Sequence, residues 1–132
     1  MKTDETIVQE LQTATEGLLF MSETDAPFAT IAWPGPDAPT PEAVRAWEGK
    51  PDAPCETDDL ARMFYGSITE FPGLNDAGQE RVRRFRRLLA ALRENLTDIC
   101  VSRVGGVQKD VYILGRSPNG KWLGLKTQVV ET

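Results

Sequence analysis

Two carboxylates lie close together in the segment GLLFMSETDAPF and are the first candidates for chemistry. Only one residue separates Glu23 from Asp25, and paired carboxylates can act as general acid and general base. Asp25 and Pro27 also favour a turn, in which carboxylates are usually solvated. The spacing therefore favours a solvated acidic turn, and catalysis by the pair stays open as the alternative.

The sequence lacks most residue types on which ordinary catalysis depends. It contains no histidine, which excludes Ser-His-Asp and Cys-His arrangements and histidine metal sites. Cys55 and Cys100 lie far apart without CxxC spacing, and we interpret them as reduced structural thiols. The phosphate-binding pattern GxxxxGK[ST] is also missing. We therefore expect neither enzymatic activity nor a cofactor of the protein's own.

The final segment, GLKTQVVET, suggests a different chemistry. Val129 and Val130 continue a strand pattern where the ends of chains usually become polar and fray. Thr132 adds a hydroxyl group and an α-carboxylate, both of which are oxygen ligands. Either this segment is only the last strand of a sheet, or the end of the chain is itself a contact.

Charge is distributed unevenly along the sequence, whose formal net charge is −5. Residues 1–80 contain four basic and sixteen acidic residues, a balance of −12, whereas residues 81–132 contain eleven and four, a balance of +7. An acidic surface would repel nucleic acid and attract a basic protein cleft. The alternative is that the two kinds of charge interleave in space.

A long helix is predicted over residues 76–96, because apolar residues recur there at spacings of three and four. Arginines fill much of the remaining surface of this helix. They could bind nucleic acid, but a solvated face paired with the acidic parts is favoured. The apolar residues are Val82, Phe85, Leu89, Leu92 and Leu96, and the arginines are Arg81, Arg83, Arg84, Arg86, Arg87 and Arg93.

The elements before this helix are short. Helical spacing predicts a first helix that ends at Gly17. Two strand-like runs follow over 18–23 and 28–33, with TDAP as the turn between them. A Thr-Pro start and a final glycine predict a short helix over 40–49. The segment CETDDLARMFYG then predicts a short edge strand and a helical turn.

After the long helix the apolar period changes to two. Three strands are predicted over 99–106, 107–115 and 121–132, joined by Gly105-Gly106 and SPNG into an antiparallel meander. Together the elements predict one α+β domain over 1–132, with helices covering a sheet. No apolar run approaches the roughly 18 residues of a membrane helix, and the N-terminal segment has no signal-peptide pattern. We expect a cytoplasmic monomer.

The segment GLLFMSETDAPF resembles the nuclease A inhibitor family, whose members carry a GLL-aromatic-MSE-x-[DE]-x-PF stretch after an N-terminal helix. FRRLLAALRENL, DVYILG and GLKTQVVET match the family in the same order. The resemblance covers nearly the whole chain. It implies a three-layer α/β/α sandwich around a mixed or antiparallel sheet, similar to the plant pathogenesis-related fold.

The resemblance also implies that the protein binds and inhibits a sugar-non-specific, Mg²⁺-dependent endonuclease in a 1:1 complex. Glu23 and Thr132 would be directed at the metal of the nuclease, and the inhibitor would do no chemistry. Such a metal keeps open positions for phosphate oxygens, so the oxygens of Thr132 could replace the substrate there. Asp25 and Glu131 would strengthen the negative field. No contact with nucleic acid or membrane is expected.

The sequence departs from the family in two places. An Asp-Trp pair in the loop before the long helix is replaced by Pro72 and Gly73 in EFPGLND, where Phe71 or Leu74 could fill the same pocket of the nuclease. Ala26 stands where the family has an aromatic residue. A general protein-interaction module with a different basic partner is therefore the main alternative. A carboxylate enzyme and a nucleic-acid binder that uses the arginine-rich helix are the others.

Overall fold

The computed structural model describes residues 2–131, whose strands form two antiparallel sheets. The five-stranded sheet has the order β3-β7-β6-β5-β4, and a separate two-stranded hairpin precedes it in the chain. The α+β class predicted from the sequence is confirmed. The hairpin consists of β1 (Leu19–Met21) and β2 (Asp25–Pro27), and the sheet consists of β3 (Ala29–Ala32), β4 (Cys55–Asp58), β5 (Thr97–Gly105), β6 (Gln108–Arg116) and β7 (Trp122–Val130).

The predicted meander forms the centre of the sheet, since β5, β6 and β7 pair in sequence order. Gly105 closes its first turn at a φ of 128°, and a Cβ on this residue would lie 2.3 Å from the carbonyl oxygen of Gln108. Only glycine tolerates that backbone conformation and that close approach. The turn therefore requires glycine at position 105 for steric reasons, which explains why Gly105-Gly106 predicted it.

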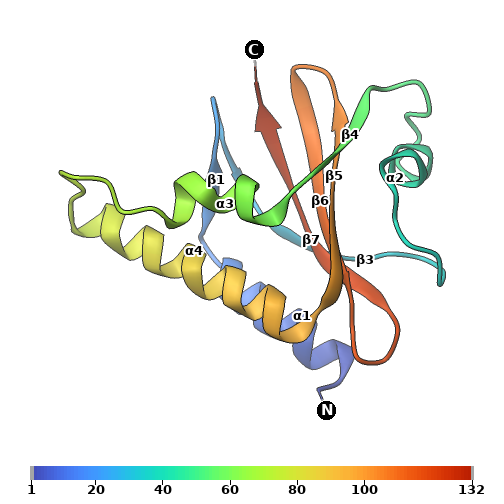
Figure 1. Cartoon of the computed structure of the whole chain (residues 1–132), viewed down its shortest axis with the longest axis horizontal. Coiled ribbons are helices and arrows are strands. Elements are labelled where there is room, and N and C mark those ends of the chain that lie inside the picture. Colours follow the sequence, from blue (N-terminus) through green and yellow to red (C-terminus); the bar gives the residue numbers. More distant parts are fainter. Residues whose placement is uncertain (1, 132) are drawn as a thin grey trace.

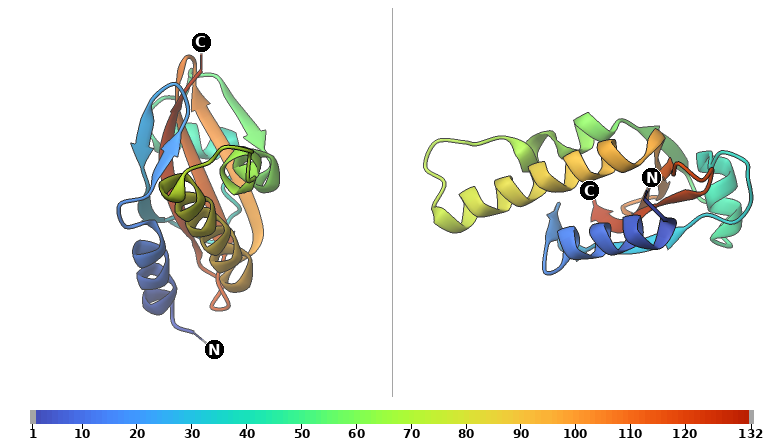
Figure 2. Two further views of the ribbon diagram at one scale, coloured as in Figure 1. Left: turned by 90° about the vertical axis from the view of Figure 1, so that its left-hand side faces the viewer. Right: turned by 90° about the horizontal axis from the view of Figure 1, so that it is seen from below.

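Three helices cover one face of the sheet (Figure 2). They are α1 (Asp4–Thr15), α3 (Leu60–Ile68) and α4 (Asp76–Asn95). The apolar stripe of α4 is buried with side chains of α1, α3 and alternate positions of the strands. Each fully buried large apolar side chain contributes about 1.5–3 kcal/mol, so this cluster is the main source of stability. Its fully buried members include Ile7, Leu11, Phe64, Phe85, Leu92 and Ile113.

The short helix α2 (Pro41–Trp47) packs on the opposite face, where Val44 forms a smaller apolar cluster with Val104, Tyr112 and Leu114. Strand β6 therefore buries side chains on both faces, because Val111 and Ile113 belong to the larger cluster. Thr40 caps α2 and Pro41 occupies its first turn, as predicted. The likeness to the plant pathogenesis-related fold stays a prediction.

Two local predictions need correction. The TDAP segment is not a turn, because Asp25, Ala26 and Pro27 form β2 and pair with β1. The turn lies earlier, where the amide of Ser22 donates to the carbonyl oxygen of Thr24 at 2.9 Å. Pairing opposite Phe20 buries Ala26, and this tertiary gain outweighs the local turn preference of the sequence. Helix α3 also extends well beyond the single turn predicted there, to nine residues.

The arginines of α4 bind neighbouring parts of the protein. Arg83 forms an ion pair with Glu80 at 2.8 Å, and Arg86 donates to the carbonyl oxygen of Ile68 at 2.9 Å. Arg84 donates to the carbonyl oxygen of Ala14 at 3.3 Å, near the end of α1. These contacts favour the interpretation of the arginine-rich helix as a solvated, internally paired face. Within residues 2–131, none of the helices combines the length and apolarity needed to cross a bilayer.

Candidate functional site

The tip of the β1-β2 hairpin is hydrogen-bonded to the end of β7. The amide of Val130 donates to Ser22 Oγ at 3.0 Å, and the amide of Glu23 donates to the carbonyl oxygen of Val130 at 3.3 Å. The hairpin tip and the end of the last strand consequently lie at the same end of the molecule (Figure 1). This contact joins segments more than 100 residues apart in the sequence, the MSE stretch and the VVET segment.

The acidic residues of the hairpin are exposed at this end. Glu23 lies in the turn and Asp25 begins β2, opposite Met21. Met21 is 51% exposed and Leu19 is also exposed, so apolar surface adjoins the two carboxylates. Thr132, the other residue expected here, lies outside the described residues. The described part of the site is therefore an acidic turn beside an apolar strand, attached to the end of β7.

Glu131 follows β7 and is held from two directions. Its amide donates to the carbonyl oxygen of Val107 at 2.9 Å, in the turn between β5 and β6. Its carboxylate, whose side chain is 50% exposed, forms ion pairs with Arg103 and, at 3.7 Å, with Lys109. These two cations offset part of the charge of the carboxylate.

Arg103 links this end of the molecule to the opposite edge of the sheet. Its side chain is 13% exposed and forms ion pairs with Asp58 at 3.1 Å and Glu56 at 3.7 Å, both on the edge strand β4. Burial lowers the pKa of the guanidinium, but hydrogen bonds and charge from Glu131 and Asp58 outweigh it and raise the pKa overall. Arg103 therefore stays charged.

Sequence reasoning did not single out Arg103. The available signal was its position in ICVSRVGG, a predicted strand in which a single arginine stands among apolar residues. Such an arginine needs acidic partners if its face of the strand is covered. Its partners come from β4 and from beyond β7, which the local pattern cannot reveal.

Phe71 and Leu74 belong to the loop between α3 and α4. This loop lies away from the hairpin tip and the end of β7 (Figures 1 and 2). Phe71 is 54% exposed, so it can reach a partner. Leu74 is half-buried, and its Cδ2 atom lies 2.9 Å from the place that a Cβ on Gly78 would occupy. Leu74 therefore packs against the first turn of α4, and Phe71 is the more accessible of the two. Ala26 is buried and offers no exposed contact.

A groove of about 340 Å³ runs between the hairpin and the first half of α4. Leu19, Met21 and Asp25 line it on the hairpin side, and Glu80 and Arg81 on the helix side. The groove extends the exposed surface from the acidic turn toward α4. It offers apolar area that a protein partner can cover.

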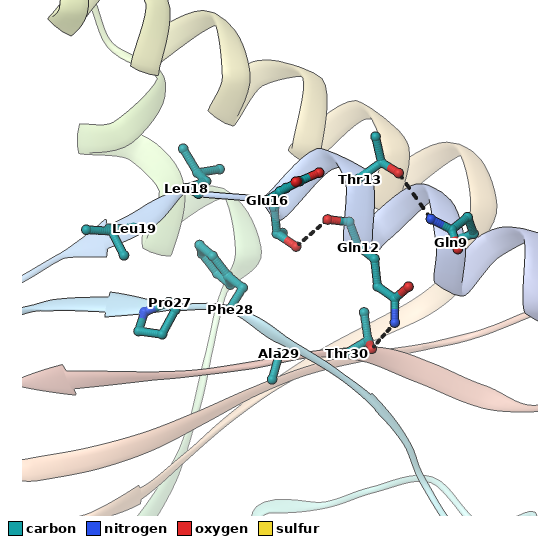
Figure 3. Close-up of a pocket in the computed structure, with 12 residues that line it drawn as sticks. Gln9, Gln12, Thr13, Glu16, Leu18, Leu19, Pro27, Phe28, Ala29 and Thr30 are labelled. Atoms are coloured by element: carbon teal, nitrogen blue, oxygen red, sulfur yellow. Dashed lines mark hydrogen bonds between the residues drawn. The ribbon is translucent and has the colours of Figure 1, made fainter.

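A second groove, of about 600 Å³, lies between α1 and β3 (Figure 3). Amide and hydroxyl side chains line much of it, and Gln12 donates to the hydroxyl of Thr30 at 3.4 Å. Among its lining residues, Glu16 is the one titratable group. The groove has no arrangement of acid, base and nucleophile.

A buried polar cluster lies on the other face of the sheet. Burial and the neighbouring carboxyl group of Asp110 raise the pKa of Glu48, which ends helix α2. Lys50 lies 3.5 Å from Glu48 and 3.3 Å from Asp110. Within residues 2–131, no three histidine, cysteine or carboxylate side chains are grouped to hold a metal ion, and Cys55 and Cys100 are free thiols.

The molecule is therefore an α+β protein with an exposed acidic turn that is hydrogen-bonded to the end of β7 and accessible to a partner. The chain belongs to the family of nuclease A inhibitor-like proteins, whose family model matches residues 5–132. This membership implies a role in nuclease inhibition and a nuclease as the target. No curated protein matches the sequence.

Proposed function

We propose that this protein inhibits a sugar-non-specific, Mg²⁺-dependent endonuclease by inserting its acidic end into the active site. Family membership supports the inhibitory role. The observation that carries the mechanism is the pair of hydrogen bonds between the hairpin tip and Val130. These bonds tie Glu23 to the strand that leads to Thr132. The metal belongs to the nuclease, and the inhibitor performs no reaction and needs no cofactor.

The chemistry of the two residues suits a magnesium centre. Mg²⁺ prefers hard oxygen ligands and normally keeps positions for water and substrate phosphate. The α-carboxylate of Thr132 is ionised at neutral pH, with a reference pKa of about 3.5, and its hydroxyl group adds a further oxygen. Glu23 can accept hydrogen bonds from metal-bound water or from a basic side chain of the cleft.

Rigidity of the supporting strand favours tight binding. Strand β7 pairs with β6 from Trp122 to Val130 and with β3 from Leu123 to Lys126. A ligand held on such a strand loses little conformational freedom when it binds, which increases affinity. The Ser22 and Glu23 bonds extend this support to the hairpin. Both oxygen-bearing groups are therefore attached to one rigid element.

Charge and apolar area supply the remaining requirements of an interface. A nuclease cleft is basic because it binds phosphates, and a protein of net charge −5 is attracted to it. Stable interfaces bury roughly 800 Å² on each partner around a few dominant residues. Exposed Leu19 and Met21 supply apolar side chains for such a centre, and exposed Phe71, in the loop between α3 and α4, supplies a separate apolar contact. Asp25 adds negative charge beside Glu23.

The test compares three variants in a nuclease assay with DNA and RNA substrates. Deletion of Thr132 removes the proposed metal ligand, and Glu23→Gln removes one negative charge with little change of shape. Each should weaken inhibition of nuclease A by roughly 10- to 100-fold, the range for a lost hydrogen bond to a charged group. Glu42→Gln, an equivalent change on the exposed surface of α2, should leave inhibition unchanged. Full inhibition by the first two variants would refute the mechanism.

A general protein-interaction module is the second candidate. It is favoured by the loop EFPGLND, where Pro72 and Gly73 replace the Asp-Trp pair of the inhibitor family. A module of this kind would bind a basic partner without blocking catalysis. Calorimetric titration with nuclease A, combined with the activity assay, separates the candidates. Binding that leaves the nuclease active would favour the module.

A further inference from the structure

The ion-pair network around Arg103 has no part in the metal chemistry proposed above, yet it touches the last described residue. Arg103 lies on β5, directly opposite Glu56 of β4 and Val111 of β6. Its guanidinium reaches Asp58 on one side and Glu131 on the other. The contact with Glu131 spans β6 and ties the chain beyond β7 to the far edge of the sheet.

The Arg103–Asp58 pair at the centre of the network is shielded from water, whereas Glu131 is half exposed. Arg103 is 13% exposed and Asp58 is 6% exposed. Together with Phe20, Met63 and Val129 they line a cavity of about 180 Å³, and Glu131 lines it as well. Ion pairs screened from solvent are stronger and more restricted in geometry than exposed pairs. Arg103 is thus a fixed point to which Glu131 is attached.

Glu131 needs such a fixed point because it lies outside the sheet. Strand β7 ends at Val130, and residues beyond the last strand normally fray. The amide of Glu131 bonds to Val107, and its carboxylate bonds to Arg103 and Lys109. Backbone and side chain are therefore both held, so the chain leaves Glu131 from a defined position.

We propose that Arg103 is a positioning residue that, through Glu131, fixes the end of the chain for insertion into the nuclease. This inference rests on the proposed function, because it assigns Glu131 an internal role in placing Thr132. The ion pair with Arg103 holds Glu131 in place, and Glu131 itself makes no contact with the nuclease. Without this ion pair the chain end samples many positions, and binding must then order it.

The first experiment removes this ion pair and leaves the Arg103–Asp58 pair intact. Glu131→Gln should weaken inhibition of nuclease A by about tenfold, the scale of ordering one residue on binding. Glu56→Gln is the matched control, because Glu56 is also an exposed partner of Arg103 but lies on the far side from the chain end. This control should inhibit as well as the unaltered protein. Both variants should keep the same melting temperature.

A second pair of variants separates positioning from direct contact. In protein that already lacks Thr132, Glu131→Gln should cause no further loss, because nothing remains to be positioned. An equal additional loss in that background would mean that Glu131 contacts the nuclease itself, and it would overturn the inference. The double substitution Arg103→Gln with Asp58→Asn removes the buried pair together, and it should match Glu131→Gln in inhibition. If it does not fold, the Glu131→Gln series still decides the question.

The outcomes also separate this inference from the proposed function. Full inhibition by Glu131→Gln, together with a large loss on deletion of Thr132, would overturn the positioning role and leave metal capping intact. No effect of deleting Thr132 would refute both. If Glu56→Gln weakened inhibition as much as Glu131→Gln, the ion-pair network would support the sheet in general and not the chain end in particular. This result would also overturn the inference.

Discussion

Gly124→Ala is the substitution whose cost follows most directly from the structure. Gly124 lies in the middle of β7, paired with Leu114 of β6 and Ile31 of β3. A Cβ at this position would lie 1.7 Å from the carbonyl oxygen of Ile113 and 2.8 Å from its carbonyl carbon. Real Cβ atoms essentially never approach another atom within 3.0 Å. The obstructing atoms belong to the backbone, so β6 and β7 must separate locally.

The expected magnitude has two parts. Inserting a methyl group into a close-packed region costs about 1–3 kcal/mol. Each ladder hydrogen bond lost by separation of the strands adds about 1 kcal/mol. A total of about 3 kcal/mol or more corresponds to a fall in melting temperature of roughly 10 °C for a chain of this size. The distortion lies in β7, the strand that leads to the proposed binding residues, so inhibition of the nuclease should weaken as well.

Thermal unfolding followed by circular dichroism checks this prediction. Gly66→Ala is the matched control, because Gly66 lies in α3 with no other atom within 4 Å of a Cβ and with no positive φ. Helix propensity predicts that this control gains up to about 1 kcal/mol. Equal melting temperatures for Gly124→Ala and the unaltered protein would refute the argument that β6 and β7 leave no room at this position.

Two further predictions concern charge and contact. The pKa of Glu48 is raised in the folded state, so its contribution to stability is present below its unfolded pKa of about 4.3 and is lost as pH rises through the folded value. Urea unfolding measures the free energy of unfolding of Glu48→Gln and of the unaltered protein. The stability of the variant relative to the unaltered protein should increase from pH 4 to pH 7. A difference in unfolding free energy that does not change with pH would contradict this. Phe71→Ser should weaken nuclease inhibition by about tenfold or more without lowering the melting temperature, whereas Tyr65→Ser, at another exposed aromatic residue, should preserve inhibition. Equal inhibition by both variants would exclude Phe71 as an anchor.

Elements with strong periodicity were predictable from local chemistry. The apolar stripe of α4 and the glycine turns of the meander specified their structures through spacing and backbone sterics alone. The hairpin was predicted less well, because Asp25 and Pro27 carry a local turn signal that pairing with β1 overrides. Helix α3 was predicted too short, because its length depends on Phe64 packing into the core.

The candidate site divides in the same way. Glu23 was proposed from the resemblance of the MSE stretch to the inhibitor family, and Asp25 from its position beside Glu23 in the sequence; both are exposed. Arg103 was missed, because its importance comes from partners on β4 and beyond β7. Ala26, which stands where the family has an aromatic residue, lies buried opposite Phe20, and the local sequence did not indicate this packing.

The sequence by itself determined the family, the α+β class and the residue types available for function. It also excluded histidine chemistry, because a missing residue type cannot be supplied by folding. Only the tertiary structure decided that the hairpin tip bonds to Val130 and that Glu131 is held by Arg103. The physical reason is that these contacts join segments distant in sequence, and sheet packing alone brings such segments within hydrogen-bonding distance.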